Sequence, residues 1–241
     1  GFKALAESGY FASKDEAIIP DGGQADGAFV EVAEKSFFLL KVNTSGKQAH
    51  AASPLSGINA FSIGSRFLVE AEDTLKERFC TANPLFDPPF STFEPTQKFA
   101  NVESHNIIPG EDSFLFDMRI LPEVDLNRVE QVLRDIATRY EYRYKVKIGL
   151  QVIDKAPAPP PTSPDSPVAQ RLISSLREAG VQARCGGIGG GTCAEFLRRL
   201  SIPAAVWSTV LELAHQPNEY ALVDNLVNDT AIFLSVIEKY C

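Results

Sequence analysis

The sequence predicts an α/β protein into which a second, α+β domain is inserted. Between Phe37 and Asp154 we expect the order β-α-β-β-α-β, which is typical of a ferredoxin-like sandwich of two helices on an antiparallel sheet. From Val168 onward, helical and strand patterns alternate one by one, as in α/β folds. Between these blocks, the run Ala156–Pro167 holds six prolines, which exclude regular structure and favour a domain boundary.

The N-terminal residues predict short elements. Gly1–Ser8 has the pattern of a helix end, and Gly9 suits the C-cap position. Ala17–Pro20 is a short apolar strand that runs into the turn Asp21-Gly22-Gly23. Phe29–Ala33 follows as a second strand.

The middle of the chain supplies the four strands and two helices of the inserted domain. Apolar residues alternate or cluster in the four expected strands, which are Phe37–Val42, Phe90–Phe99, Ser113–Leu121 and Val146–Ile153. Pro54 and Asn59 open the first helix, in which Ile58, Phe61, Phe67, Leu68, Ala71 and Leu75 recur at helical spacing. The second helix is expected from about Leu126 to Tyr140, with one apolar face.

The C-terminal part alternates in type along the chain. Its expected elements are helix Val168–Ala179, strand Val181–Cys185, helix Cys193–Leu200, strand Ala204–Trp207 and helix Leu226–Tyr240. We therefore expect one α/β domain built from residues 1–36 and 155–241, interrupted by an α+β domain of residues 37–154.

Composition limits the class of protein. A chain of 241 residues that is 44% hydrophobic can bury a sizeable core. The net charge of −8 argues against a nucleic-acid partner, and no aromatic strand of the RRM type is present. The longest apolar runs, such as Phe37–Leu40, are too short to cross a bilayer, and nothing resembles a signal peptide. Four dispersed cysteines fit reduced thiols, so we expect a cytoplasmic protein.

Few residues stand out as candidates for chemistry. The only histidines are His50, His105 and His215, and a single histidine in a loop is more often a surface residue than a ligand. Asp21 before two glycines is by itself an ordinary turn. The glycine-rich stretch Gly186–Gly191 lacks the Walker lysine and the dinucleotide spacing, so it does not indicate a phosphate site.

Taken together, three stretches resemble the M20 family of peptidases and deacylases. They are IIPDGG…GKQAHAASPLSGINA (Ile18–Ala60), NIIPGEDSFLFDMRILPE (Asn106–Glu123) and GIGGGTCAEFLRRLSIPAAVWSTVLELAHQPNEY (Gly187–Tyr220). The family includes acetylornithine deacetylase, succinyl-diaminopimelate desuccinylase, aminoacylase and relatives of glutamate carboxypeptidase. The resemblance implies that the α/β part belongs to a zinc-peptidase-like catalytic domain and that the insertion is its lid and dimerisation domain.

The resemblance also implies roles for three residues near a pair of metal ions. Asp21 matches a carboxylate ligand of one ion, and His215 matches an imidazole ligand of the other. Two Zn²⁺ ions suit such oxygen and nitrogen ligands, and Co²⁺ or Mn²⁺ fits the geometry as well. His50 matches the lid histidine that, in dimeric members, donates a hydrogen bond to the oxyanion in the partner subunit's active site.

Three further residues are candidates for substrate binding. Asn106 and Arg119 match lid residues that hold the substrate, and Thr192 is placed to offer its hydroxyl and N–H to a substrate anion. Structural alternatives stay open, because Arg119 can pair with Asp117 or Glu123, and Thr192 can act only as a helix N-cap. Glu219 can orient a neighbouring group or simply face water, and His105 has no expected role.

The activity implied is metal-dependent hydrolysis of an N-acyl amino acid or a short peptide by a homodimer that pairs through the lid. In the family, a histidine, a bridging aspartate and a Glu-Glu pair precede the segment that matches Gly1, and no Glu-Glu pair occurs here. We therefore expect these residues to be a fragment that lacks the N-terminal metal ligands and general base, and that is inactive alone. The alternative hypothesis is a non-catalytic dimerisation or interaction module derived from the same family.

Overall fold

A computed structural model describes residues 1–214 and 216–240 and divides into two compact units. Unit 1 comprises Gly1–Lys35, Pro84–Asp87 and Ala158–Cys241, and unit 2 comprises Ser36–Asn83 and Pro88–Pro157. The predicted insertion was continuous, whereas four residues of the proline-rich loop after the first long helix belong to unit 1. Over the described ranges, no helix is both long and apolar enough to span a bilayer.

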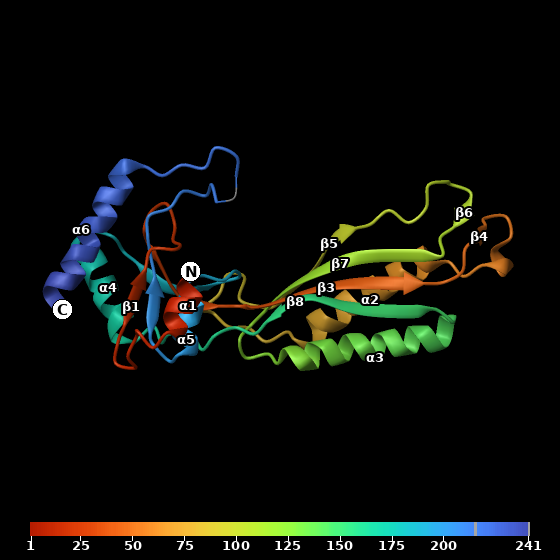
Figure 1. Ribbon diagram of the computed structural model, residues 1–241, viewed down its shortest axis with the longest axis horizontal. Coiled ribbons are helices and arrows are strands. Elements are labelled where there is room, and N and C mark those ends of the chain that lie inside the picture. Colours follow the sequence, from red (N-terminus) through yellow and green to blue (C-terminus); the bar gives the residue numbers. More distant parts are fainter. Residues whose placement is uncertain (215, 241) are drawn as a thin grey trace. The chain divides into compact units, whose positions relative to one another are not determined.

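Unit 2 has the predicted order of strands and helices. Its main elements are β3 (Ser36–Ser45), α2 (Ala60–Arg78), β5 (Thr92–Lys98), β7 (Glu111–Ile120), α3 (Leu126–Tyr144) and β8 (Lys147–Ala156). The four strands form an antiparallel sheet in the order β5-β7-β3-β8. Figure 1 shows α2 and α3 running beside each other along this sheet.

The core of unit 2 lies between these two helices and one face of the sheet. Phe38, Leu40 and Val42 of β3 are fully buried and alternate with half-buried residues, as the period of a strand requires. Both helices begin at side-chain caps: Asn59 accepts a hydrogen bond from the N–H of Ser62, and Asp125 accepts one from the N–H of Asn127. These caps fix where each helix starts.

The first helix differs from its prediction at two positions. Pro54 lies in a separate 3₁₀ turn, η1 (Pro54–Ser56), so α2 begins only at Ala60. Phe61 was assigned to the buried face, but it is 47% exposed and lies under the ammonium group of Lys98. The sequence also did not predict the two-stranded ribbon that β4 (Ala49–His50) and β6 (Ile107–Ile108) form.

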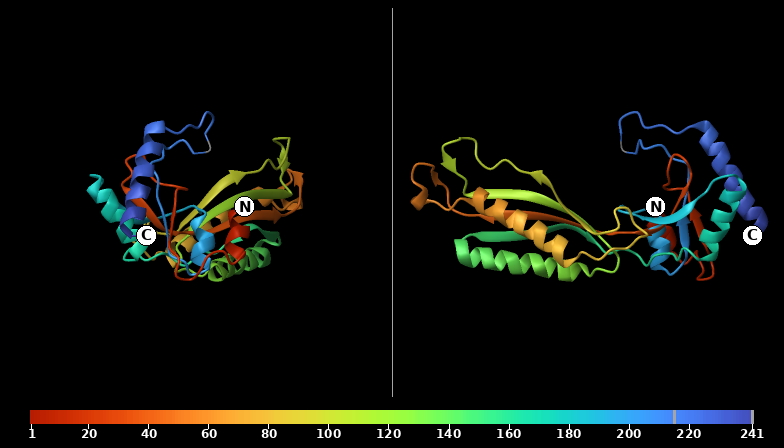
Figure 2. Two further views of the ribbon diagram at one scale, coloured as in Figure 1. Left: turned by 60° about the vertical axis from the view of Figure 1, so that its left-hand side comes forward. Right: turned by 180° about the vertical axis from the view of Figure 1, so that it is seen from behind.

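Unit 1 is a mixed sheet covered by helices on both faces. Its elements are α1 (Phe2–Glu7), β1 (Ala17–Ile19), β2 (Phe29–Glu34), α4 (Pro167–Glu178), β9 (Arg184–Ile188), α5 (Ala194–Arg199), β10 (Ala204–Val206) and α6 (Val223–Tyr240). The strand order is β1-β10-β2-β9, in which β1 is parallel to β10 and β2 is parallel to β9. One apolar cluster joins the sheet to α4 and α6, and a second joins it to α1 and α5. The ribbon views of Figure 2 show helices on either side of this sheet.

Strand β9 lies three residues later than the sequence suggested. Gly186 and Gly187 lie beyond the expected strand, in the glycine-rich stretch, but both are strand residues that pair with β2. A Cβ atom at either position would lie 2.3 Å from a ring carbon, of Phe29 at Gly186 and of Phe86 at Gly187. These glycines therefore serve close packing of aromatic rings against the strand rather than a turn.

Candidate functional site

Asp21 lies directly beyond the end of β1, at an edge of the sheet of unit 1. Because β1 and β10 are parallel and Ile19 pairs with Val206, the chain leaves both strands at the same edge. The turn after Asp21 packs closely on Ser208, the second residue after β10: Ser208 Oγ donates to the Gly22 carbonyl at 3.2 Å. A Cβ atom at Gly23 would lie 1.8 Å from the Ser208 carbonyl oxygen, so only glycine fits there.

His215, the second predicted metal ligand, lies outside the described residues. The residue from which its loop departs is held firmly. Thr209 donates its N–H and its hydroxyl to the Asp229 carboxylate of α6, at 2.8 and 2.7 Å, and its carbonyl accepts from Asn225 Nδ2 at 3.4 Å. Asp229 is buried. The loop therefore starts from a fixed point next to the Asp21 turn.

The first turn of α5 also meets Asp21. The N–H of Cys193 donates to Asp21 Oδ2 at 2.8 Å. A hydrogen bond between the Cys193 thiol and this carboxylate is the largest cause that raises the pKa of the thiol, and burial adds to it. The Asp21 side chain is otherwise exposed.

A buried cluster of charges that was not predicted from the sequence lies behind this turn. Glu31 and Glu34 of β2 face Arg198 of α5, and all three side chains are at most 2% exposed. Arg198 Nη1 donates to Glu31 Oε1 at 2.7 Å and to Glu34 Oε1 at 3.3 Å. The available signal was two carboxylates in the otherwise apolar strand FVEVAE.

Burial dominates the acidity of both carboxyl groups. Desolvation raises the pKa of Glu31 to about 7, although the charge and hydrogen bond of Arg198 oppose the change. Desolvation also raises the pKa of Glu34, against its hydrogen bonds from Thr192. One guanidinium therefore serves two carboxyl groups, and one of the two readily holds a proton near neutral pH.

Thr192 is tied to this cluster. It was predicted to offer its hydroxyl and N–H to a substrate anion, and in this structure both donate to Glu34 Oε1, at 2.7 and 3.1 Å. Its Oγ1 also accepts the N–H of Ala194, the first residue of α5, at 3.2 Å. The N-cap residue itself is Cys193, so Thr192 makes this hydrogen bond from one residue before the observed capping position.

In unit 2 the structure brings His50 and Asn106 together on the β4–β6 ribbon. His50 pairs with Ile107, and the N–H of Ala51 donates to the Asn106 carbonyl at 2.8 Å. The Nδ1 atom of His50 accepts the N–H of Ala52 at 3.1 Å. A neutral imidazole whose Nδ1 is an acceptor carries its proton on Nε2, so this exposed ring presents an N–H donor outward.

Arg119 lies at the other end of unit 2. Its Nε and Nη2 atoms donate to both oxygens of Asp117, at 2.7 and 3.0 Å, and its guanidinium stacks 4.3 Å from the ring centre of Phe37. Arg119 and Glu111 stand at opposite ends of β7, which at about 3.3 Å per residue places them about 26 Å apart. Glu111 is paired with Ser45, near the β4–β6 ribbon, so Arg119 and His50 of one chain cannot both touch one small substrate.

The fit of a metal ion to these residues is partial. Asp21 has the chemistry of a ligand, an exposed carboxylate with one oxygen oriented by a backbone N–H. Across residues 1–214 and 216–240, however, no three or more His, Cys, Asp or Glu side chains gather as a metal site would require. A complete centre therefore needs ligands beyond those that the structure describes.

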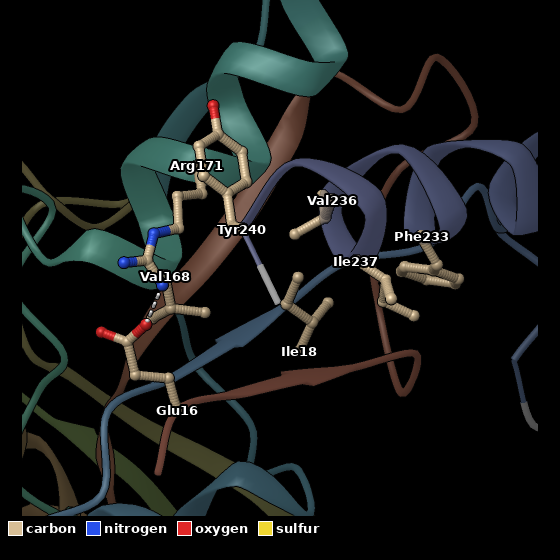
Figure 3. Close-up of a pocket in the computed structure, with 8 residues that line it drawn as sticks. All are labelled: Glu16, Ile18, Val168, Arg171, Phe233, Val236, Ile237 and Tyr240. Atoms are coloured by element: carbon tan, nitrogen blue, oxygen red, sulfur yellow. Dashed lines mark hydrogen bonds and ion pairs between the residues drawn. The ribbon is translucent and has the colours of Figure 1, made fainter. Parts of the chain in front are cut away.

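The apolar hollow beside α6 is a separate feature. It has a volume of about 280 Å³, lies between α4, α6 and β1, and includes Ile18, Phe233 and Val236 in its lining (Figure 3). Its polar rim is the ion pair between Arg171 and Glu16, at 2.9 Å. None of the predicted site residues lines this hollow.

Comparison with protein families covers most of the chain. Residues 92–239 match the model of peptidase family M20/M25/M40, and residues 32–145 match that of the peptidase dimerisation domain. The chain belongs to the M20/M25/M40 family of peptidases. The predicted resemblance is thereby confirmed.

Several relatives are similar over nearly all of this chain. An uncharacterised metallohydrolase of Methanococcus maripaludis is 35% identical over 96% of this chain and 59% of its own length. Acetylornithine deacetylase of Myxococcus xanthus is 27% identical over the whole chain and 61% of its own length. Among solved structures, aminopeptidase PepT of Bacillus cereus has the same fold, with a TM-score of 0.77 and 16% identity over 99% of this chain and 61% of that one. The chain thus spans about three fifths of these relatives.

Proposed function

We propose that this chain is part of a cytoplasmic, metal-dependent amidohydrolase that cleaves N-acyl amino acids or short peptides. Unit 1 would contribute to the catalytic domain, and unit 2 would form the lid and dimerisation domain. Asp21 and His215 would each bind one of two divalent ions, most simply Zn²⁺. The remaining ligands and the general base would come from outside these 241 residues.

The observation that carries this proposal is the shared edge of β1 and β10. Asp21 follows the first strand, and the loop that contains His215 follows the second from a point packed on the Asp21 turn. Ligands on neighbouring parallel strands converge at their carboxyl ends, which is where sites form in α/β sheets. The relatives named metallohydrolase and deacetylase support the same chemistry.

Three residues of unit 2 would have defined roles in such a reaction. A bound divalent ion would polarise the amide carbonyl and make water nucleophilic at neutral pH. His50 would donate its Nε2 proton in a hydrogen bond to the oxyanion, because its Nδ1 is already an acceptor. Arg119, whose guanidinium is hydrogen-bonded to Asp117 and stacked on the ring of Phe37, would bind the substrate carboxylate. Asn106 would hold the substrate beside His50.

The first prediction concerns the two ligands. In the full-length protein, Asp21→Asn and His215→Ala should each lower zinc-dependent hydrolysis of acetyl- and succinyl-amino acids and of dipeptides by about a hundredfold or more, because an incomplete centre loses the positioned ion. His105→Ala is the matched control and should retain wild-type activity. The 241 residues alone should show no turnover until the rest of the protein is supplied. Equal activity of the Asp21 and His105 variants would refute the proposal.

The second prediction concerns the origin of His50. We propose that the ribbon of one subunit serves the site of another, with about 26 Å along β7 between Arg119 and the ribbon end of unit 2 as support. His50→Ala and Asp21→Asn proteins should each be nearly inactive. After the two are mixed and allowed to exchange subunits, about a quarter of the wild-type activity should return, because half of the dimers are mixed and each has one intact site.

The same experiment distinguishes a His50 that serves the partner's site from one that serves the site of its own subunit. If His50 served its own subunit, a mixed dimer would have one site without the histidine and one without the aspartate, and no activity would return. Light scattering or sedimentation of the full-length protein should show a dimer. A monomer at micromolar concentration would contradict the exchange of lids.

A further inference from the structure

Two sets of hydrogen bonds hold the two residues before α5 from different sides. From β2, Glu34 Oε1 accepts both the N–H and the hydroxyl of Thr192, at 3.1 and 2.7 Å. From the loop after β1, Asp21 Oδ2 accepts the N–H of Cys193 at 2.8 Å. Thr192 and Cys193 are joined by one planar peptide group, so the orientation of the first residue sets the direction of the second residue's N–H.

Glu31 is the closer of the two carboxyl groups to Arg198. Its contact with the guanidinium is 2.7 Å long, against 3.3 Å for Glu34. Both carboxyl groups are 2% exposed, and a buried carboxylate needs hydrogen-bond donors around it. The donors that lie closest to Glu34 are the hydroxyl and the N–H of Thr192.

We propose that Glu34 is a positioning residue for Asp21. Through Thr192 it holds the Cys193 N–H against one oxygen of the Asp21 carboxylate, so that the carboxylate keeps one orientation toward a bound cation. Contacts of this kind behind a ligand typically change metal affinity by about 10–100-fold. The inference deepens the proposed function, because it rests on Asp21 being a ligand.

The test measures zinc binding by the full-length protein in competition with a chromophoric chelator. Thr192→Val keeps the shape of the side chain but removes the hydroxyl, and it should weaken zinc binding by about 10–100-fold. Thr192→Ser restores the hydroxyl and should bind zinc close to the wild-type value. Glu34→Leu should behave like the valine variant, and Glu34→Gln, which keeps an acceptor oxygen, should bind zinc close to wild type.

A second readout distinguishes positioning from a defect in folding. At saturating zinc, kcat of Thr192→Val should recover toward the wild-type value, with KM for the substrate little changed. A purely structural role would lower the free energy of unfolding and leave the zinc affinity of the folded protein unchanged. Should Glu34→Leu fail to fold, the pair of Thr192 variants still decides the question.

Asp21→Asn, measured alongside, keeps the two proposals separate. Unchanged zinc affinity in Asp21→Asn would refute the role of Asp21 as a ligand, and the positioning role with it. Weakened binding in Asp21→Asn together with wild-type binding in Thr192→Val would overturn the positioning role alone. Weakened binding in both, restored by Thr192→Ser, is the expected result.

Discussion

Replacing Arg198 by methionine is expected to lower the free energy of unfolding by about 3–5 kcal/mol at neutral pH, the usual loss when one member of a buried ion pair is removed. The guanidinium is 1% exposed and serves two buried carboxyl groups. It also donates from Nη2 to the Ala204 carbonyl at 2.9 Å. Methionine fills a volume similar to that of arginine. The lower free energy of unfolding would therefore come from the buried polar groups that lose their partner, and not from a cavity.

The measurement can use a natural probe. Trp207 is the single tryptophan of the sequence and is buried in the core of unit 1, so its fluorescence follows the unfolding of the unit that contains Arg198. The decrease in the free energy of unfolding caused by Arg198→Met should be smaller near pH 5 than near pH 8, because the carboxyl groups of Glu31 and Glu34 need no cation when they are protonated.

Arg199→Met is the matched control for this substitution. Arg199 is the next residue, its side chain is 39% exposed, and it pairs with Glu195 at 3.7 Å on the surface. A surface pair contributes about 0–1 kcal/mol. Equal losses for Arg198→Met and Arg199→Met would show that the buried cluster does not stabilise unit 1 as described.

The second large effect is expected in the pH dependence of stability. The pKa of Glu31 rises from 4.5 to about 7 in the folded protein because burial disfavours its charged form. Between these values the folded state binds more protons than the unfolded state, so the stability contributed by neutral Glu31 is complete below pH 4.5 and is lost as pH rises toward 7. The loss amounts to about 3 kcal/mol at 1.36 kcal/mol per pH unit.

Glu31→Gln removes this titration. The free energy of unfolding of the variant minus that of the wild type should therefore increase by about 3 kcal/mol between pH 4.5 and 7, followed by Trp207 fluorescence. Glu178→Gln is the control, since that carboxylate is 58% exposed and pairs with Lys239 at the surface, where such pairs contribute about 0–1 kcal/mol. If the difference in free energy of unfolding between Glu31→Gln and the wild type did not change with pH, the raised pKa of Glu31 would be contradicted.

The structure of unit 2 was the most predictable part of the chain, because local patterns specify it. Phe114, Phe116 and Met118 alternate with polar or half-buried neighbours along β7, and all three are buried. The helices begin after Asn59 and Asp125, which satisfy backbone N–H groups within three residues. Periodicity and caps act over short distances, so the sequence alone reveals them.

Other features depended on contacts that no local pattern shows. The glycines of β9 resemble turn residues, and only the rings of Phe29 and Phe86 explain why a strand needs them. Arg119 was left open between a substrate role and a pair with Asp117; the pair exists, and the substrate role stays a prediction.

Motifs and periodicity are properties of neighbouring residues, so they were enough to predict the family, the order of the strands and helices, and the candidate residues Asp21 and His50. Contacts between residues far apart in the chain could be seen only in the folded protein. Glu31 and Glu34 were two acidic residues in an apolar strand until folding placed Arg198 and Thr192 against them. The physical reason is that burial changes the energy of a charge by several kcal/mol, and burial is set by the packing of segments far apart in the chain.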